Sequence, residues 1–580
     1  MNLEDNDEDC TIYIEELKSD DPNLKINAVS KITSIAEILG PRRVREELIP
    51  YIIEIIEELD NEDEFLIKLA EQILLLNDFI DGKEHSHLLI SPLELLSSME
   101  ENSVREKAVK CLIQIAQDQS PKFFTNNFLP MVRQLAQWDN YSSRISACSL
   151  LGACYSQFNQ TEKKEILQFF QELCRDDTPM VRRTAAENLG YIADCQKGDF
   201  IYSVLVPLWQ DLVQDQTDSV KVKAIEVSIK LMDKLNKQEV SDQFVKPLKD
   251  VLNLKNKSWR IRYAVAEVLG DLVNHLEKEV SRKEMVTIYE TLLKDSEHEV
   301  RSVALIKLKD ICKCLTEGVL VNNILPILNG LVQDTSQHVR TSLGEVLCSI
   351  SVNFEVKNVI SGILPIIENL LKDDMLDVRL NVMNNIEPLN NHIGNDNVKK
   401  SVLPLFEQIS TEKQWRFRLA FVEFLPKLTQ QLGFAEFKDN LIEYMKQFFF
   451  DHYSEIRQQN FKNFITLSKQ HGYQNIKPII VEGINNLAKS SNYIFRVSSL
   501  QGIQIISEIL PKSDLQSLFE DMSSKLMSDP VPNVKINLLK LYISIQDKLD
   551  PSVRVSFSSN AKRSLAQDTD SDVQYYITQI

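Results

Sequence analysis

Residues 334–350 read DTSQHVRTSLGEVLCSI, and this stretch decides the fold of the chain. It begins with an aspartate, and an apolar–basic pair, Val339-Arg340, follows five residues later. From that pair onward, apolar residues recur at i, i+4, i+8 and i+11, namely at Val339, Leu343, Leu347 and Ile350. This spacing places them on one face of an α-helix. The stretch therefore predicts a turn that contains Asp334, followed by an amphipathic helix that contains Arg340.

The same pattern repeats along the whole sequence. Its basic position occurs fifteen times at intervals of 38 to 41 residues, at Lys25, Leu66, Arg105, Arg144, Arg182, Lys221, Arg262, Arg301, Arg340, Arg379, Arg418, Arg457, Arg496, Lys535 and Gln574. Arginine or lysine fills thirteen of these positions. Aspartate fills the turn position of nine repeats, and Glu412 fills that of a tenth. Such regularity indicates an array of one structural unit.

A second apolar stretch precedes the turn, often with a proline, as at Pro130, Pro207, Pro326, Pro365 and Pro404. Proline is tolerated in the first turn of a helix but bends a helix that has already started, so both interpretations stay open. Each repeat is thus predicted to be two helices joined by the turn. One such pair cannot bury its apolar stripe alone, and stacked pairs can. A period of about 39 residues matches HEAT repeats, whereas tetratricopeptide and ankyrin repeats have periods of about 34 and 33. The predicted fold is all-α, an α-solenoid of about fifteen HEAT repeats.

The repeated aspartate and arginine are interpreted as structural residues. An aspartate near a helix start can cap free N–H groups. The forked guanidinium of the arginine can bind the aspartate of the neighbouring repeat, which would produce a ladder of ion pairs along the stack. The helix stripe is predicted in every repeat, including the first, where it consists of Leu24, Ala28, Ile32 and Ile35.

Composition excludes several classes of function. The 580 residues include 84 acids and 65 bases, a net charge of -19, which disfavours binding to nucleic acid or to an anionic membrane. There is no glycine-rich phosphate loop, no apolar run long enough for a transmembrane helix and no secretory signal in the acidic start. Nine scattered cysteines favour a reducing compartment. We therefore expect an intracellular, soluble protein.

No motif in the sequence indicates catalysis. The close pairs His85/His87 and Cys312/Cys314 have no companions at metal-ligand spacing, so the histidines are assigned to an inter-repeat loop and Cys312 to the helix core or its edge. The sequence therefore predicts a protein that is not an enzyme and that needs no cofactor or metal.

Four turns depart from the repeat pattern and suggest a binding surface. Residues 176–183 contain doubled aspartate and arginine, residues 257–262 and 413–418 each contain a Trp-Arg pair, and residues 491–496 contain a tyrosine. Tryptophan, tyrosine and arginine dominate the energetically important positions of protein interfaces. The alternative is that each tryptophan packs locally against a neighbouring turn.

At these residues the chain resembles the scaffolding (A) subunit of protein phosphatase 2A. The resemblance rests on DDTPMVRR at 176–183, KSWRIRY at 257–263, WRFRLA at 415–420 and DPVPNV at 529–534, together with residues 100–105 and 142–148. It covers essentially the full length and includes the number of repeats. It implies a non-catalytic scaffold that holds a phosphatase catalytic subunit together with one of several regulatory (B-type) subunits in a heterotrimer.

The resemblance also implies which residues contact each partner. The catalytic-subunit surface would consist of Trp415, Arg416, Tyr493, Arg496, Val531, Asn533 and Tyr575. The regulatory-subunit surface would consist of Glu100, Glu101, Asp177, Pro179, Met180, Arg182, Arg183, Trp259 and Arg260. In the turn 451–455 the tyrosine is shifted by one position from the family pattern, so this turn is left out of the predicted surface.

The expected organisation follows from the repeats and the resemblance. Residues 1–10 are expected to be disordered, residues 11–400 to form repeats 1–10 with the regulatory-subunit surface mainly in repeats 1–8, and residues 401–580 to form repeats 11–15 with the catalytic-subunit surface. Two alternatives remain, a transport receptor of the importin-β kind and another HEAT-repeat adaptor. The two Trp-Arg turns argue for the phosphatase scaffold.

Overall fold

The computed structural model describes residues 12–580 except 20, 59–61, 118, 254–257 and 278–283. In these residues every regular element is a helix and there is no strand, which confirms the predicted all-α class. The chain divides into two compact units, Met1–Leu315 and Thr316–Ile580, called here the N-terminal and the C-terminal unit. The segment 1–10, expected to be disordered, lies outside the described residues.

The helices that follow the turns, called B helices, begin close to the predicted positions. In the N-terminal unit they are α2 (Pro22–Val29), continued by the start of α3 (Ile32–Arg43), then α5 (Asp63–Leu75), α7 (Asn102–Ala116), α10 (Tyr141–Cys154), α12 (Pro179–Asp194), α15 (Asp218–Met232), α18 (Trp259–His275) and α21 (His298–Ile311). In the C-terminal unit they are α24 (Gln337–Ile350), α27 (Leu376–Asn385) with its continuation α28 (Glu387–Ile393), α30 (Trp415–Leu432), α33 (Ser454–His471), α35 (Tyr493–Ile506), α37 (Pro532–Ile545) and α39 (Ser571–Thr578). One B helix follows each of the fifteen predicted turns.

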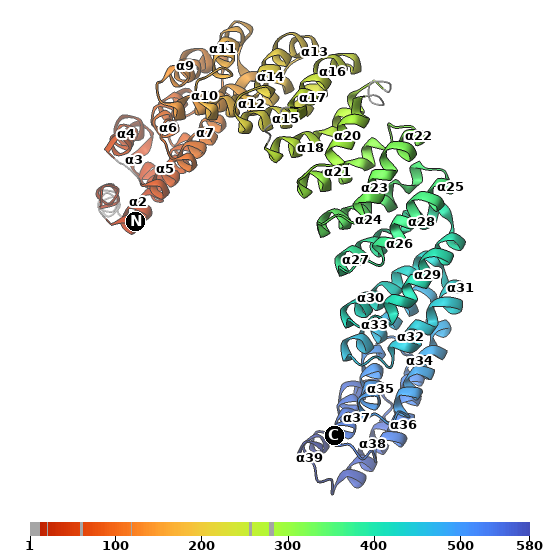
Figure 1. Ribbon diagram of the computed structural model, residues 1–580. Coiled ribbons are helices and arrows are strands. Elements are labelled where there is room, and N and C mark those ends of the chain that lie inside the picture. Colours follow the sequence, from red (N-terminus) through yellow and green to blue (C-terminus); the bar gives the residue numbers. More distant parts are fainter. Residues whose placement is uncertain (1–11, 20, 59–61, 118, 254–257, 278–283) are drawn as a thin grey trace. The chain divides into compact units, whose positions relative to one another are not determined.

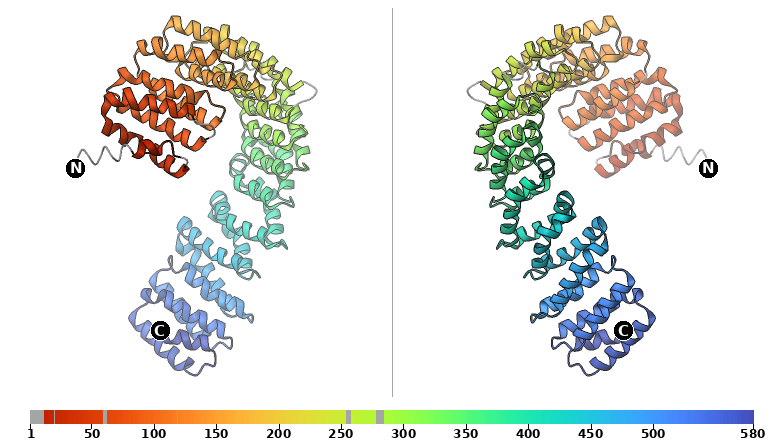
Figure 2. Two further views of the ribbon diagram at one scale, coloured as in Figure 1. Left: turned by 90° about the vertical axis from the view of Figure 1, so that its left-hand side faces the viewer. Right: turned by 90° about the vertical axis from the view of Figure 1, so that its right-hand side faces the viewer.

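The helices that precede the turns, called A helices, form the other layer of each unit (Figure 1). In the N-terminal unit their main segments are α4 (Ile49–Glu58), α6 (Ile90–Ser97), α9 (Leu129–Gln137), α11 (Gln160–Leu173), α14 (Val206–Val213), α16 (Lys237–Gln243) with α17 (Val245–Asn253), and α20 (Val286–Leu293). In the C-terminal unit they are α23 (Leu325–Leu331), α26 (Leu364–Leu370), α29 (Asn395–Ser410), α32 (Ile442–Phe448), α34 (Tyr473–Ala488), α36 (Lys512–Leu526) and α38 (Pro551–Leu565). Figure 2 shows the repeats of each unit stacked side by side.

The prolines of the A helices mark bends rather than simple starts. Four of them follow a single π-helical turn, at η4 (Phe124–Phe128), η6 (Ile201–Leu205), η8 (Leu320–Ile324) and η10 (Val359–Ile363). Short segments precede these turns, namely α8 (Pro121–Phe123), α13 (Gly198–Phe200), α22 (Glu317–Val319) and α25 (Val356–Asn358). A proline ring clashes with the carbonyl four residues earlier, and the wider π turn relieves that clash. Two further π turns, η1 (Val44–Leu48) and η11 (Phe437–Leu441), the latter after α31 (Phe434–Glu436), lie at the same place in their repeats, whereas Pro404 lies inside α29.

The remaining helical segments are short. Single 3-10 turns follow four B helices, at η2 (Leu76–Asp78), η5 (Tyr155–Gln157), η9 (Ser351–Asn353) and η12 (Gln546–Lys548). A longer one, η3 (Lys83–Leu89), contains His85 and His87, which the sequence assigned to a loop. The assignment to a loop was therefore wrong, because both histidines belong to a 3-10 helix that leads directly into α6.

The predicted apolar stripe forms the core between the two layers. Val339, Leu343, Leu347 and Ile350 are each at most 1% exposed, and the equivalent residues of α18 and α30 are buried as well. Leu24 is the exception, because it is 42% exposed in the first repeat, which has a neighbouring repeat on one side only in the described part of the chain. Cys312 is buried, as predicted.

Candidate protein-interaction surface

The aspartate of each turn closes a hydrogen-bonded turn with its own backbone. Its Oδ1 accepts from the N–H two residues later, as in Thr178 N to Asp176 Oδ1 at 2.8 Å and Val531 N to Asp529 Oδ1 at 2.9 Å. Thr178 and Val531 are the N-cap residues of α12 and α37. The prediction that these aspartates cap the helix was therefore wrong. They lie two positions earlier, in an Asx turn, and their Oδ2 remains available for an arginine.

That arginine belongs to the preceding repeat, which confirms the predicted ladder of ion pairs. In six pairs Nε donates to Oδ2 at 2.5–2.7 Å: Arg144–Asp176, Arg182–Asp215, Arg262–Asp295, Arg340–Asp373, Arg418–Asp451 and Arg496–Asp529. Lys535 and Asp568 form the same link, and Arg379 reaches Glu412 at 3.4 Å. We call this row of pairs the ladder. Each pair joins two consecutive repeats at their turns.

Each ladder arginine also fixes its own turn. Nη1 of Arg340 donates to the Asp334 carbonyl at 2.7 Å, and Nη1 of Arg182 donates to the Asp176 carbonyl at 2.6 Å. Hydrogen bonds to the partner carboxylates raise the pKa of both arginines. Burial alone would raise the pKa of Asp215, but hydrogen bonds from Arg182 and from the Thr217 backbone outweigh it and lower that pKa.

The ladder is interrupted at two buried arginines. The aspartate position that would face Arg105 is filled by Trp138, and the one that would face Arg457 is filled by Ser490. Arg105 is 5% exposed and donates only to the carbonyls of Met99 and Glu100 and to Asn102. Nε of Arg457 donates to the Ser498 hydroxyl at 2.8 Å. Burial lowers the pKa of both guanidinium groups, because no carboxylate is paired with them.

The predicted regulatory-subunit residues lie at three turns of the N-terminal unit. Asp177 and Met180 are exposed before and at the start of α12, next to the half-buried Pro179 and Arg183. Arg182 also lies there, but its guanidinium is hydrogen-bonded within the ladder.

At the other two turns the predicted residues already have local contacts. Glu101 caps α7 through the Ser103 N–H, and Glu100 beside it is exposed. At the start of α18, Arg260 lies over the Trp259 ring, 4.9 Å from its centroid, and Tyr263 meets that ring edge-on.

A surface hollow of about 450 Å³ brings part of this set together. Met180 and Arg183 of α12 and Arg260 of α18 line it, with α15 between them. The turn at 176–183 and the described part of the turn at 257–262, which the sequence singled out separately, therefore border one continuous surface. The intervening α15 contributes Lys223 and Glu226, which sequence reasoning did not include.

The predicted catalytic-subunit residues lie at the N-terminal ends of four B helices in the C-terminal unit. Trp415 and Arg416 begin α30, Tyr493 begins α35 and Val531 is the N-cap of α37. Tyr493 and Tyr575 are 40% and 60% exposed, and Asn533 is exposed as well. Arg496 is hydrogen-bonded to Asp529 in the ladder. This edge therefore presents aromatic and polar side chains beside a rigid row of ion pairs.

Sequence reasoning missed one member of this edge. Tyr453, at the start of α33, stacks on Trp415 of the preceding repeat, with ring centroids 5.3 Å apart and an interplanar angle of 16°. It remains 43% exposed. Trp415 thus packs against a neighbouring turn and also lies at the surface, so the two alternatives for this tryptophan are compatible. The signal in the sequence was an aromatic residue three positions before Ile456, the first buried residue of α33.

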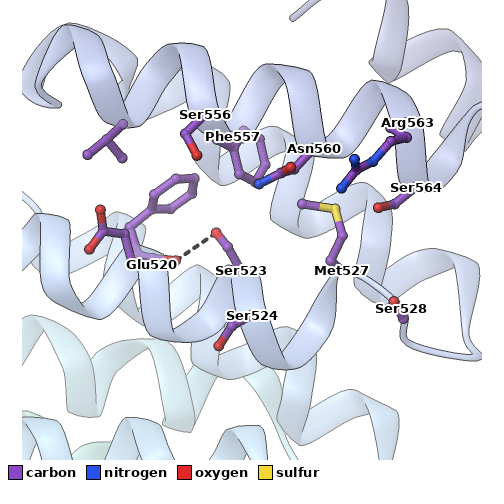
Figure 3. Close-up of a pocket in the computed structure, with 12 residues that line it drawn as sticks. Glu520, Ser523, Ser524, Met527, Ser528, Ser556, Phe557, Asn560, Arg563 and Ser564 are labelled. Carbon is purple, nitrogen blue, oxygen red and sulfur yellow. Dashed lines mark hydrogen bonds between the residues drawn. The ribbon is translucent and has the colours of Figure 1, made fainter.

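A further surface hollow lies in the C-terminal unit. The hollow drawn in Figure 3, about 460 Å³, lies between the A helices α36 and α38 and is lined by hydroxyls, Asn560, Arg563 and Glu520, with no histidine or cysteine. Within the described residues no group of three or more histidine, cysteine or acidic side chains could hold a metal ion. No helix of the described part is long and apolar enough to cross a membrane.

Comparisons with known proteins agree with the resemblance. Residues 278–353 match the PPP2R1A-like HEAT repeat family, and residues 166–196 match the HEAT repeat. The chain is 41% identical over 210 residues to the protein phosphatase 2A scaffold subunit of Dictyostelium discoideum, covering 36% of each chain. It is 39% identical over 232 residues to the probable serine/threonine-protein phosphatase PP2A regulatory subunit of Caenorhabditis elegans, covering 40% of this chain and 39% of the relative. The alignments thus span less than half of these relatives.

Solved structures share the fold at low sequence identity. Importin beta superposes with a TM-score of 0.53 at 13% identity, over 93% of this chain and 74% of importin beta. Kap121p, in its complex with RanGTP, superposes with a TM-score of 0.59 at 13% identity, over 98% of this chain and 61% of that protein. At such identity the likeness concerns the fold alone. The chain is a HEAT-repeat α-solenoid related in sequence to the scaffold subunits of protein phosphatase 2A.

Proposed function

We propose that this chain is the non-catalytic scaffold of a protein phosphatase 2A heterotrimer, acting in cytoplasm and nucleus. The observation that carries the proposal is its sequence relation to proteins named as phosphatase 2A scaffold or regulatory subunits in several organisms. In this proposal the turns of repeats 11–15 bind the catalytic subunit. The turns of repeats 1–8 bind one regulatory subunit, which would determine substrate choice.

The arrangement of the turns supports this division. Beside the ladder, Tyr493 and Tyr575 of the C-terminal unit and Met180 of the N-terminal unit are exposed, and Trp415 and Trp259 are half-buried. Such residues provide large contact areas at interfaces. Two partners held on one scaffold increase each other's effective concentration without a new contact between them. The scaffold can thus bring a substrate-binding subunit to the phosphatase without taking part in its chemistry.

Affinity purification of the tagged full chain from native lysate tests this function. We expect a phosphatase catalytic subunit together with regulatory subunits in the eluate, which should hydrolyse a phosphoester, whereas the purified chain alone should not. Trp415→Ala should reduce recovery of the catalytic subunit by at least about tenfold, because buried aromatic contacts at interfaces are worth about 2 kcal/mol or more. Quantitative mass spectrometry of the eluate measures both partners.

Two variants serve as controls in the same purification. Trp138→Ala removes another exposed turn tryptophan, in the N-terminal unit, and should leave the catalytic subunit unchanged. Arg183→Ala should reduce regulatory subunits and leave the catalytic subunit bound. Recovery of transport cargo or a small GTPase with no phosphatase would contradict the proposal, as would equal losses of the catalytic subunit in all three variants.

A further inference from the structure

A groove crosses three consecutive B helices of the N-terminal unit. It has a volume of about 540 Å³ and is lined by α7, α10 and α12. α10, the middle helix of the three, contributes Ile145 and the small side chains of Ser146, Ser149 and Ala153 to the lining. The longer side chains of α7 and α12 form its two walls. We call it the α7–α12 groove.

The groove contains the buried arginine at which the ladder is interrupted. Arg105 lines it, and unlike the six arginines that bind a ladder aspartate it has no ion pair with a described residue and no hydrogen bond from Nε. Glu101 and Glu106 attract this guanidinium electrostatically but form no hydrogen bond or ion pair with it. A guanidinium that is only 5% exposed and has no counter-ion is costly, and an incoming carboxylate would compensate it.

Arg183 is a second cation of the groove that has no carboxylate partner among the described residues, because the two carboxylates of the lining are paired with lysines. Glu106 lies 3.8 Å from Lys110, and Glu187 lies 3.8 Å from Lys223, so each carboxylate of the lining has a lysine partner. Arg183 on the opposite wall forms no ion pair with any described residue. The groove thus offers two arginines without anionic partners, on a chain whose net charge is -19. This local reversal of charge favours an anionic occupant.

The groove also has partly exposed apolar side chains, among them Tyr191, whose ring centroid lies 4.5 Å from Nζ of Lys230. Met180 and Tyr191 on the α12 wall are 47% and 48% exposed, and Val109 and Ile113 lie on the α7 wall. Met180 and Arg183 line this groove and the hollow that reaches Arg260 as well. The groove is therefore continuous with the turn surface assigned above to regulatory subunits.

We propose that the α7–α12 groove binds an acidic peptide segment of a regulatory subunit, whose carboxylates pair with Arg105 and Arg183 and whose apolar side chains cover Met180 and Tyr191. The identity of the partner rests on the proposed function. The chemistry of the segment rests on the groove alone. A carboxylate of such a segment would take the place of the ladder aspartate that Arg105 lacks, because Trp138 fills that position in the next repeat.

A defined peptide tests the chemistry directly. The purified full chain is titrated into a fluorescein-labelled peptide of alternating glutamate and leucine, and binding is followed by fluorescence anisotropy. We expect saturable binding that weakens with added salt, and at least about tenfold weaker binding to Arg183→Glu and to Lys110→Glu. Arg105→Gln should weaken binding too, with circular dichroism used to check its fold. The matched control is Lys122→Glu, an exposed lysine on α8 outside the groove, which should bind as the unaltered chain does.

Several outcomes would overturn the proposal. They are the absence of saturable binding, equal affinity for a peptide of alternating glutamine and leucine, and equal losses in Lys122→Glu and Arg183→Glu. The test needs no phosphatase, so its failure is distinguishable from failure of the scaffold function. If the peptide does not bind while Trp415→Ala still releases the catalytic subunit, only the groove assignment is wrong. If the peptide binds and no phosphatase is recovered, the groove remains and the scaffold function is wrong.

Discussion

A ladder arginine holds two repeats together with one side chain. In Arg182, Nη1 binds the carbonyls of its own turn while Nε and Nη2 bind Asp215 of the next repeat. Asp215 in turn closes its own turn through the Thr217 N–H. One ion pair therefore fixes the turns of two consecutive repeats and their position relative to each other. Because these bonds fix the edge, the exposed Met180 and the half-buried Arg183 beside it are held in place for a partner.

Loss of this arginine should destabilise the stack more than loss of an exposed one. Arg182→Met leaves Asp215 buried without its counter-ion and should cost about 1–3 kcal/mol. Arg175→Met, in the same repeat, breaks the exposed pair with Asp211 and should cost less than about 1 kcal/mol. Thermal unfolding of the two variants at neutral pH measures the difference. Equal midpoints would show that the ladder pair contributes nothing beyond a surface ion pair.

The cost of Arg182→Met should also depend on pH. The pKa of Asp215 is lowered in the folded chain, so its contribution to stability is present above its unfolded pKa of about 4 and is lost as the pH falls through the folded value. The difference in unfolding midpoint between the variant and the unaltered chain should therefore be full at pH 7 and shrink below about pH 4. A difference that grew on acidification would contradict this assignment.

Close approach between elements depends on glycine at a few helix positions. A Cβ added at Gly502 of α35 would lie 2.2 Å from the ring of Phe461 on α33, and that ring is 1% exposed. Two consecutive B helices can pack this closely only because Gly502 has no side chain. At Gly330 of α23, by contrast, a Cβ would meet nothing within 4 Å.

These two glycines provide a matched test of helix packing. Gly502→Ala should destabilise the chain by about 1–3 kcal/mol, because the buried ring cannot move away. Gly330→Ala should stabilise it by about 0.5 kcal/mol, because alanine favours the helix and has free space. Chemical denaturation monitored by circular dichroism compares the variants. Stabilisation by both substitutions would show that α33 and α35 can separate at little cost.

At the level of elements, the spacing of apolar residues predicted the buried helix faces, whereas residue type did not predict the contacts that individual side chains make. The stripes of α24, α18 and α30 are buried as expected, because a helix face is determined by local spacing. Spacing did not predict the role of Asp176. An aspartate just before a helix can either cap the helix or close an Asx turn, and the structure shows the Asx turn. The stack of Tyr453 on Trp415 joins two repeats, so no pattern within one repeat could reveal it.

The family resemblance predicted the residues of the candidate surfaces, but it did not predict the hollow and the groove that lie beside them. Trp259 and Arg260 stand out in the sequence, but the hollow that joins Arg260 to Met180 also requires residues of α15, which lies between the two turns. The α7–α12 groove likewise combines residues of three consecutive B helices, α7, α10 and α12. Spacing within one repeat shows which residues share a helix face. A hollow or groove is formed by several neighbouring repeats, so spacing within one repeat does not reveal it.

For the whole molecule, the division into two compact units has a functional consequence. The N-terminal unit contains repeats 1–8 and all residues of the predicted regulatory-subunit surface, whereas the C-terminal unit contains all residues of the predicted catalytic-subunit surface. In a solenoid each repeat contacts mainly its neighbours, so stability is a sum of local terms. Each unit should therefore retain its own fold and its own partner.

Expression of residues 316–580 alone tests this independence. Each repeat of this unit buries its own stripe, as in α30 and α37, so the fragment should show a helical circular dichroism spectrum with cooperative unfolding. It should capture the catalytic subunit from lysate in a manner that Trp415→Ala abolishes, and it should recover no regulatory subunit. An unfolded fragment would show that the C-terminal unit depends on the preceding repeats. Recovery of regulatory subunits without the catalytic subunit would place the two surfaces the other way round, because the fragment lacks every turn assigned to regulatory subunits.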